Sequence, residues 1–308
     1  MNKILFIAGN GLSIDLFQYL GSPYNPSSPF LFDVPHPLYG DKKLLDELTR
    51  VKEMIKAGSG KNDFVIIEDF INNYREDEEH LWRHGELRQY LSLAYAHANA
   101  DLLARWRSGW RWEQWLNKNY SKLAGAVSFN YDLGLETTLS KLSLEYYRPG
   151  TPEEDTPKGI PIFKPHGSCD FDISNRAISM PLEARLKSLT RLNDAGIIEV
   201  VSKNKLSEPR TEADIVLPFE KSPQRHLRWI QRGEETIKKI AKTVDTCIIV
   251  GISYRSCDRQ EIDSIINELP RDIKIELVTP TENKKFEKRL REISCKAEKI
   301  APEIFLKE

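Results

Sequence analysis

The sequence has few cysteines, little net charge and no long apolar run. Among its 308 residues, 45 Lys and Arg balance 46 Asp and Glu, so no strong field favours nucleic acid or an anionic membrane surface. No apolar stretch approaches the roughly 20 residues that span a bilayer, and we expect a cytoplasmic protein without a membrane segment. The cysteines lack the close pairs of a metal site, so we expect reduced thiols and no bound metal: Cys169, Cys247, Cys257 and Cys295.

Internal repeats and low-complexity tracts are absent too. The apolar start at residues 3–8 is too short for a signal peptide and runs directly into a glycine turn, so we expect a first strand there. The chain is long enough for one large domain or two smaller ones with a substantial core.

What the sequence does contain is a set of short polar segments, each directly after an apolar run that is short enough to be a buried strand. In a parallel sheet, residues just past the strand ends gather at one edge, where ligands bind. The sequence therefore predicts one shared cleft formed by residues 7–13 (IAGNGLS), 127–132 (VSFNYD), 164–168 (KPHGS) and 250–253 (VGIS).

Between the first and second of these segments the pattern becomes helical. Residues 21–40 are rich in proline, serine and glycine, which predicts an irregular loop, and its aromatic residues favour a loop that packs on the protein. Residues 41–120 show apolar positions at three- and four-residue spacing, which predicts four or five helices. Five tryptophans in this region indicate helix packing or, alternatively, an aromatic surface for a base or a partner: Trp82, Trp106, Trp110, Trp112 and Trp115.

The remaining pattern alternates between strands and helices, except in residues 177–217, which give no clear prediction. Further strands are expected at 125–129, 144–147, 162–164, 246–250 and 274–278. Helices are expected at 11–20, 133–142, 225–243, 258–268 and 281–293.

This order predicts an α/β fold: a Rossmann-like, mainly parallel sheet with helices on both faces and a large α-helical insertion after the first strand. The expected division is a sheet domain of residues 1–40 and 120–308, with residues 41–119 as the insertion.

The glycine turn Gly9-Asn10-Gly11 lies where the first strand becomes a helix. Glycines let the backbone approach a phosphate, and a helix N-terminus offers amide donors with partial positive charge. Ser13 adds a hydroxyl. The fingerprint of three spaced glycines is absent, because Ile14 fills the third position. A tight strand-to-helix turn without a ligand remains the alternative.

Asn130 and Asp132 follow the next strand two residues apart. An amide can bind a ribose or orient a water, and a carboxylate can hold a hydroxyl or stabilise developing positive charge. The alternative for Asp132 is a helix cap.

His166 also follows a strand, and histidine can exchange a proton near neutral pH. A structural histidine is the alternative. The other five histidines show no ligand spacing, which again predicts no metal site.

The last segment, Gly251-Ile252-Ser253 followed by Asp258, fits contacts to a phosphate or ribose, or a helix cap. Residues 279–283 end the next strand, where such sheets place an adenine or its ribose. A plain turn is equally natural there.

Taken together, these segments resemble the sirtuin superfamily. The opening turn ends in serine at Ser13, and Asn130 with Asp132 matches the asparagine-x-aspartate motif. His166-Gly167 matches histidine-glycine, and Gly251-Ile252-Ser253 matches glycine-x-serine. The paired cysteines of the sirtuin zinc ribbon and the loop after the first helix are missing. These departures resemble bacterial sirtuin-like proteins of anti-phage defence that hydrolyse NAD.

The resemblance implies a role for each matching residue. Asn130 would position the attacking water, His166 would act as the base, and Asp132 would help hold the nicotinamide end. The remaining matching positions would bind the dinucleotide, with the pyrophosphate at the glycine turn and the adenosine half at the last segment: Ala8, Gly9, Gly11, Ser13, Gly167, Ser168, Gly251, Ser253 and Asp258.

The resemblance thus predicts an NAD nucleosidase with NAD as substrate, acting as a regulated NAD-depleting effector of antiviral defence. It further predicts a homo-oligomer or a complex with a defence partner, such as an ATPase or a nucleic-acid-guided protein. The alternatives are a sensor or scaffold that binds NAD or ADP-ribose without turnover, and an NAD-dependent protein deacylase. The trigger, the product form and the choice between NAD and NADP are left open.

Overall fold

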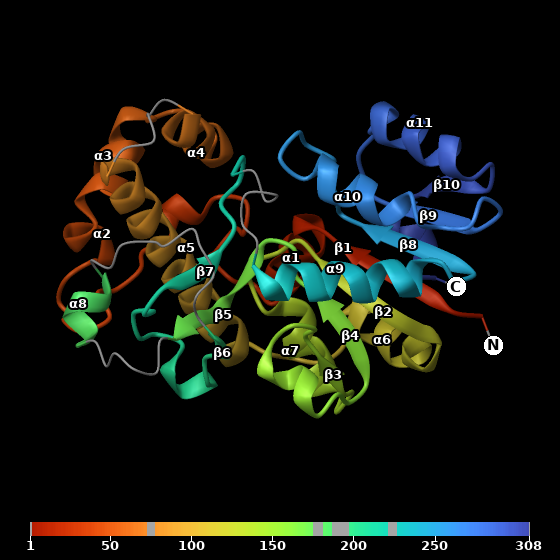
Figure 1. Ribbon diagram of the computed structural model, residues 1–308, viewed down its shortest axis with the longest axis horizontal. Coiled ribbons are helices and arrows are strands. Elements are labelled where there is room, and N and C mark those ends of the chain that lie inside the picture. The colour runs from red at the N-terminus through yellow and green to blue at the C-terminus, as the bar shows by residue number, and fades with distance from the viewer. Residues whose placement is uncertain (1, 73–77, 175–180, 187–196, 221–226, 308) are drawn as a thin grey trace.

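A seven-stranded sheet forms the larger half of the protein (Figure 1). The computed structural model describes residues 2–72, 78–174, 181–186, 197–220 and 227–307. The strand order is β10-β9-β8-β1-β2-β4-β3, and every pair in it is parallel. The strands are β1 (Ile4–Ala8), β2 (Leu123–Ser128), β3 (Tyr146–Tyr147), β4 (Ile160–Phe163), β8 (Thr246–Val250), β9 (Lys274–Val278) and β10 (Ala297–Ile300). This architecture confirms the predicted α/β fold class.

The central strand β1 is apolar along its whole length because helices cover both faces of the sheet. Its side chains alternate between the faces, as a pleated strand requires. Leu5 and Ile7 join one buried apolar cluster, whereas Phe6 and Ala8 join the other.

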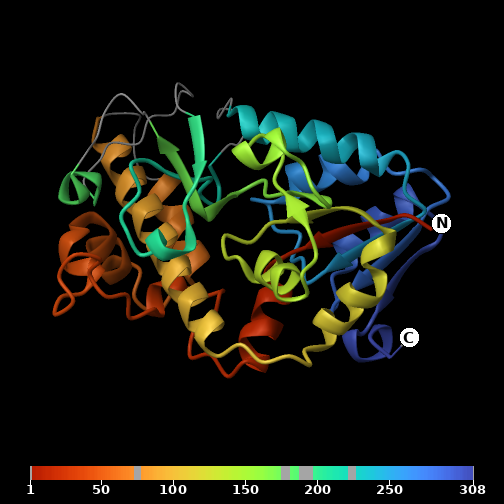
Figure 2. The ribbon, with the colours of Figure 1, turned by 90° about the horizontal axis from the view of Figure 1, so that it is seen from below.

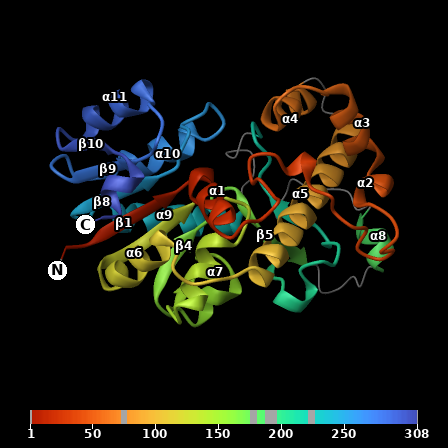
Figure 3. The ribbon, with the colours of Figure 1, turned by 180° about the vertical axis from the view of Figure 1, so that it is seen from behind.

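Two groups of helices form these clusters with the sheet. One face carries α1 (Asn10–Tyr19), α6 (Arg111–Asn119), α7 (Gly134–Lys141) and α12 (Pro302–Phe305), which are in front of the sheet in Figure 3. The other carries α9 (Arg228–Ala241), α10 (Arg259–Ile266) and α11 (Lys284–Ile293).

Two glycines set how closely α9 approaches the sheet. A Cβ atom on Gly233 would lie 2.2 Å from the ring of Phe163 on β4, and one on Gly125 of β2 would lie 3.0 Å from the side chain of Ile240. Since no larger side chain fits, these glycines allow close helix-to-sheet packing.

The helices predicted between the first and second strands are α2 (Leu44–Glu47), α3 (Thr49–Ala57), α4 (Asp63–Asn72), the long α5 (Glu78–Ala104) and α6. The last of them packs on the large sheet, where Trp112 and Trp115 contact Phe6 with ring centroids 6.0 and 5.5 Å apart. The tryptophans of α6 therefore pack in the core.

A second, antiparallel sheet in the order β6-β5-β7 lies beside α5 (Figure 2). Its strands are β5 (Gly167–Ser174), β6 (Ile197–Val200) and β7 (Ala213–Ile215), and α8 (Leu182–Leu186) lies between β5 and β6 in the chain. The sequence did not predict this sheet. Part of the unpredicted stretch, residues 177–180 and 187–196, lies outside the described residues, as do residues 225–226 at the expected start of α9.

The proline-rich loop of residues 21–40 packs as expected. Phe30 and Phe32 are buried, and two hydroxyls of α5 fix the backbone of the loop. The Tyr90 hydroxyl donates to the Pro29 carbonyl over 2.8 Å, and the Tyr95 hydroxyl donates to the Pro26 carbonyl over 2.7 Å. In the described part of the chain, no helix has the length and apolarity needed to cross a membrane.

Candidate active site

A cavity of about 270 Å³ lies at the carboxyl edge of the large sheet. Five strand ends supply its floor, through Gly9–Gly11, Phe129–Asp132, His166, Gly251–Ser253 and Thr279–Thr281. The opposite wall comes from the insertion and the loop before it, through Ser27, Asn62, Phe64 and Tyr95. The structure therefore brings all four sequence segments to one cavity.

The residues proposed from the sequence divide into two groups. Those that line the cavity are Gly9, Gly11, Asn130, Asp132, His166, Gly251, Ser253 and Asp258. Those that lie outside its lining are Ala8, Ser13, Gly167 and Ser168. All four of the latter are buried, so they act on the cavity only through their neighbours.

The glycine turns after β1 and β8 pack against each other. A Cβ atom on Gly11 would lie 2.6 Å from the Cα of Gly251, and Gly251 itself has a φ of +61°. The Gly9 and Gly11 amides donate to the carbonyls of Val250 and Gly251 over 2.8 and 3.0 Å. Glycine is thus required here by the contact between the turns. The two amides are already used, so the expected pyrophosphate contact needs other donors.

Asn130 lines the cavity and keeps one acceptor without a partner among the described residues. Its Nδ2 donates to the Gly9 carbonyl over 3.0 Å and to the Ser13 Oγ over 2.8 Å. Because a carbonyl oxygen only accepts, the amide nitrogen must face Gly9, which fixes the orientation of the side chain. Its Oδ1 is then left buried with no hydrogen-bond partner among the described residues. A buried acceptor without a partner costs about 1–3 kcal/mol, so a ligand or water at this atom is favourable.

Asp132 makes the contact of a helix cap, the alternative that its position allowed. Its Oδ1 accepts the amide hydrogen of Gly134 over 2.8 Å at the start of α7, as a cap does. Its Oδ2 is buried, and no described residue donates to it. The carboxylate is therefore fixed by one oxygen, while its other oxygen stays buried without a described partner.

His166 lies against the two neighbours of Asn130. Its ring contacts Phe129 edge-on, with centroids 5.3 Å apart, and its ring centroid lies 6.3 Å from that of Tyr131. The backbone carbonyl of His166 accepts from the Val216 amide over 2.9 Å, and the Tyr131 hydroxyl donates to the Val216 carbonyl over 2.6 Å. Burial raises the pKa of Tyr131 well above its usual value, so this hydroxyl stays protonated. The ring of His166 is thus held beside the Asn130 loop.

Asp258 approaches the same histidine from the loop after β8. Its Oδ1 lies 3.9 Å from the Nε2 of His166, and the two side chains are 23% and 12% exposed. The loop therefore reaches across the cavity from β8 to the end of β4.

Gly167 follows His166 in a left-handed conformation with a φ of +78°. A Cβ atom there would lie 2.1 Å from the Asp214 carbonyl oxygen. This position needs glycine for a structural reason, because it lets the chain turn from His166 into β5 against β7.

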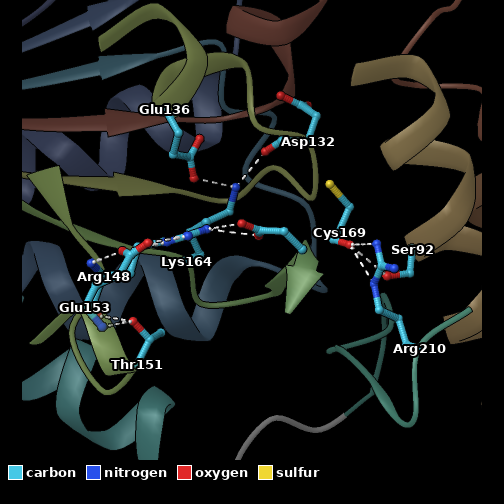
Figure 4. Close-up of polar contacts among 10 residues, drawn as sticks. Ser92, Asp132, Glu136, Arg148, Thr151, Glu153, Lys164, Cys169 and Arg210 are labelled. Carbon is cyan, nitrogen blue, oxygen red and sulfur yellow. Dashed lines mark hydrogen bonds and ion pairs between the residues drawn. The ribbon is translucent and has the colours of Figure 1, made fainter. Parts of the chain in front are cut away.

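A buried charged network supports the site from below (Figure 4). The Lys164 ammonium donates to the Asp132 carbonyl over 2.6 Å and lies 2.8 Å from Glu136, and so holds the loop that carries Asn130. Arg148 binds both carboxylate oxygens of Asp170 over 2.9 and 2.7 Å. Burial disfavours the charged form of Asp170, but Arg148, the Ser168 hydroxyl and Lys164 together outweigh this effect and lower the pKa of the carboxyl.

Sequence reasoning missed Arg148, Arg255 and Phe64. Lys164 was inside a predicted segment, yet its support of the Asn130 loop was not foreseen. Arg255 had a usable signal, because it comes two residues after Ser253 in a predicted cavity loop. Phe64 had none, since it lies on α4 of the insertion, far away in the sequence. In the described part of the chain, no group of three His, Cys, Asp or Glu side chains is arranged to hold a metal ion.

No protein-family model matches the sequence, and no curated protein matches it. Similar solved structures include one described as the structural basis for the mechanism and regulation of Sir2 enzymes, at 12% identity and a TM-score of 0.37 over 99% of this chain and 89% of that one. A Sir2 homologue mutant bound to ADP-ribose is 13% identical, with a TM-score of 0.37 over 92% and 82% of the two chains. A Sir2 homologue bound to NAD is 13% identical, with a TM-score of 0.35 over 97% and 84%. TM-scores this low do not indicate an activity. The fold class is assigned from the strand order.

Proposed function

We propose that the cavity binds NAD and that the chain hydrolyses the bond between nicotinamide and its ribose, releasing nicotinamide and ADP-ribose. The observation that carries this proposal is the buried, unpartnered Oδ1 of Asn130 in a cavity that also contains His166. An acceptor and a proton acceptor that line one cavity suit a reaction that positions and deprotonates a water.

For this hydrolysis the protein must position the dinucleotide and a water, and it must supply a base. As the bond between C1′ and nicotinamide breaks, its electron pair leaves with the nicotinamide, which becomes neutral. Positive charge develops on the ribose, and the oxygen of a water bonds to C1′. The proton lost by that water goes to His166 and then to solvent.

Each lining side chain has a defined task in this scheme. Asn130 Oδ1 accepts a hydrogen bond from the water or from a ribose hydroxyl. Asp132 Oδ2 accepts from the carboxamide of nicotinamide, and its negative charge stabilises the positive ribose. Ser253 and the end of β9 face the adenosine half, on the other side of the β1 turn.

The test is nicotinamide release by wild type, Asn130→Ala and His166→Ala. General acid–base catalysis supplies about 10²–10⁴-fold, so we expect each variant to lose at least about a hundredfold in turnover. Matched controls are Asn117→Ala, on the exposed side of α6, and His97→Ala, whose ring pairs with Tyr24 outside the cavity lining. Both controls should keep the wild-type rate. An Asn130→Ala protein that cleaves NAD at the normal rate would remove the assignment.

The same experiment separates the hydrolase from a binding sensor when NAD affinity is measured in parallel. A sensor would bind NAD and release no nicotinamide under any condition. Because an unregulated NAD hydrolase is toxic to its cell, we expect the purified chain to be weakly active. The assay is therefore run with and without candidate partners.

The wider role is also part of this proposal. The sequence resemblance supports a cytoplasmic effector of antiviral defence that works as a homo-oligomer or with a partner. Infecting cells that carry the wild type or His166→Ala, and measuring cellular NAD, tests this role. NAD should fall only with the wild type.

A further inference from the structure

One side chain of the cavity lining carries a positive charge. Of the described residues that line the cavity, Arg255 is the only lysine or arginine. The lining carboxylates are Asp132, near the Asn130 end, and Asp258, beside His166. No ion pair of Arg255 is found among the described residues, so no carboxylate of that part of the chain neutralises its charge.

The loop that carries Arg255 is held firmly by the residue before it. Tyr254 is buried with a φ of +50°, and its ring stacks on Phe286 with centroids 4.3 Å apart. Its hydroxyl donates to the carboxylate of Asp263, at 2.9 Å from Oδ1. With Tyr254 anchored away from the cavity, the neighbours Ser253 and Arg255 both line it.

The guanidinium itself has a defined place. The Arg255 Cζ lies 5.0 Å from the centroid of the Phe64 ring on α4, a cation–π contact. Phe64 also lines the cavity, so this contact holds the charge between the sheet edge and the insertion.

Strand order places the β8 end, after which the loop with Arg255 begins, on the adenosine side of the β1 turn, and Asp258 later in that loop reaches His166. The nicotinamide end of the proposed substrate lies at Asn130 and His166, which follow β2 and β4. The β1 turn lies in the middle, and β8 and β9 lie beyond it. From β4 to β9 there are four strand spacings of about 4.8 Å, roughly 19 Å, which suits an extended dinucleotide.

We propose that Arg255 binds a phosphate on the adenosine ribose, so that the preferred substrate is the 2′-phosphorylated dinucleotide, NADP. This inference rests on the proposed function. In dinucleotide folds, a carboxylate at this end bonds the free 2′-hydroxyl of NAD, whereas an arginine accommodates the 2′-phosphate. Here the cavity lining includes the hydroxyls of Thr279 and Thr281, 3.3 Å apart at the β9 end, and the guanidinium in the loop after the neighbouring β8. A guanidinium binds a phosphate monoester through two parallel hydrogen bonds.

The experiment measures binding of NAD and NADP to the full chain by calorimetry, and nicotinamide release from both. The variants are Arg255→Ala and, as a matched control, Arg271→Ala, an exposed arginine outside the cavity lining. We expect the wild type to bind NADP more tightly than NAD. Arg255→Ala should weaken NADP binding about tenfold to a hundredfold and change NAD binding by less than about threefold. Arg271→Ala should change neither.

The outcomes separate this inference from the proposed function. If Arg255→Ala weakens both ligands equally, the guanidinium contacts the shared pyrophosphate, and the inference is overturned while hydrolysis of NAD stands. A wild type that binds and cleaves NAD with no preference for NADP also overturns it and leaves the proposed function intact. If neither dinucleotide binds the wild type, both proposals fail.

Discussion

Two helices of this protein cover strands in chemically opposite ways. The helix α9 packs on β2 and β4 through apolar side chains such as Ile237 and Ile240. The helix α5 packs on β5 and β7, where the Arg88 Nε donates to the Ile215 carbonyl over 2.7 Å and the Ser92 Oγ donates to the Cys169 carbonyl over 3.2 Å. One interface is apolar, and the other adds side-chain hydrogen bonds to strand carbonyls.

The difference follows from the strands that are covered. Strands inside the parallel sheet pair on both sides, so their backbone groups are satisfied and only apolar side chains need burial. The pairing of β5 with β7 shifts register between Gly167 and Asp172. The carbonyl of Cys169 lies within that break, and it accepts from Ser92 and from Arg210, at 2.7 Å from Nη2 (Figure 4). Because the ladder between β5 and β7 is incomplete, its unpaired carbonyls need hydrogen-bond donors, and polar side chains of α5 supply some of them.

The strongest test of this comparison is the charged pair that joins the two sheets. Arg148 follows β3 of the large sheet, and Asp170 lies in β5 of the small one. Arg148→Met should lower the free energy of unfolding by about 3–5 kcal/mol, because it leaves a buried carboxylate without its partner. Urea denaturation followed by circular dichroism measures this change.

The control for that change is Arg232→Met. Arg232 pairs with Glu154 over 2.6 Å, but its side chain is 46% exposed, so its loss should cost less than about 1 kcal/mol. Equal losses for Arg148→Met and Arg232→Met would mean that the buried pair does not hold the sheets together.

The apolar interface predicts a loss of somewhat smaller size. Ile237 of α9 is fully buried and packs over Gly125 of β2. Ile237→Ala should destabilise the protein by about 2–4 kcal/mol, because it removes buried apolar surface and leaves a cavity. Ile237→Val should cost about 0.5–1.5 kcal/mol in the same denaturation experiment. An alanine variant as stable as the wild type would contradict the packing of α9 described here.

The polar interface predicts the smallest loss. Gln89 of α5 donates to the Arg210 carbonyl over 2.6 Å and accepts from the Arg210 amide over 3.1 Å. Gln89→Leu keeps the size of the side chain and leaves both backbone groups without that partner, which should cost about 1–3 kcal/mol. Hydrogen exchange of the Arg210 amide is the sharper readout.

In this variant the Arg210 amide should exchange faster while the amides of β8 keep their protection. If Gln89→Leu stabilises the protein, the interface tolerates apolar contact and the contrast between the two helices does not hold.

Much of the large sheet could be predicted from the sequence. The strands β8 and β9 have the bounds that their apolar runs indicated, residues 246–250 and 274–278. The small sheet was not predicted, and β5 buries Asp170 and Asp172, where the alternation of residues 169–173 would leave polar side chains exposed. Those carboxylates are stable there because Arg148 and the amides of Thr211 and Glu212 bind them. The strand β10 and helix α12 were also missed, being short and partly exposed.

For the cavity, the sequence alone determined which strand ends carry polar residues, since a short apolar run followed by glycine, asparagine or histidine is a local pattern. Only the tertiary structure decided what those residues do. In the folded chain the Gly9 and Gly11 amides donate to the turn after β8. One oxygen of Asn130 has no partner among the described residues, and Arg255 lies over the Phe64 ring. Such contacts join residues far apart in the chain, and hydrogen-bonding capacity is shared among whichever groups the fold brings together.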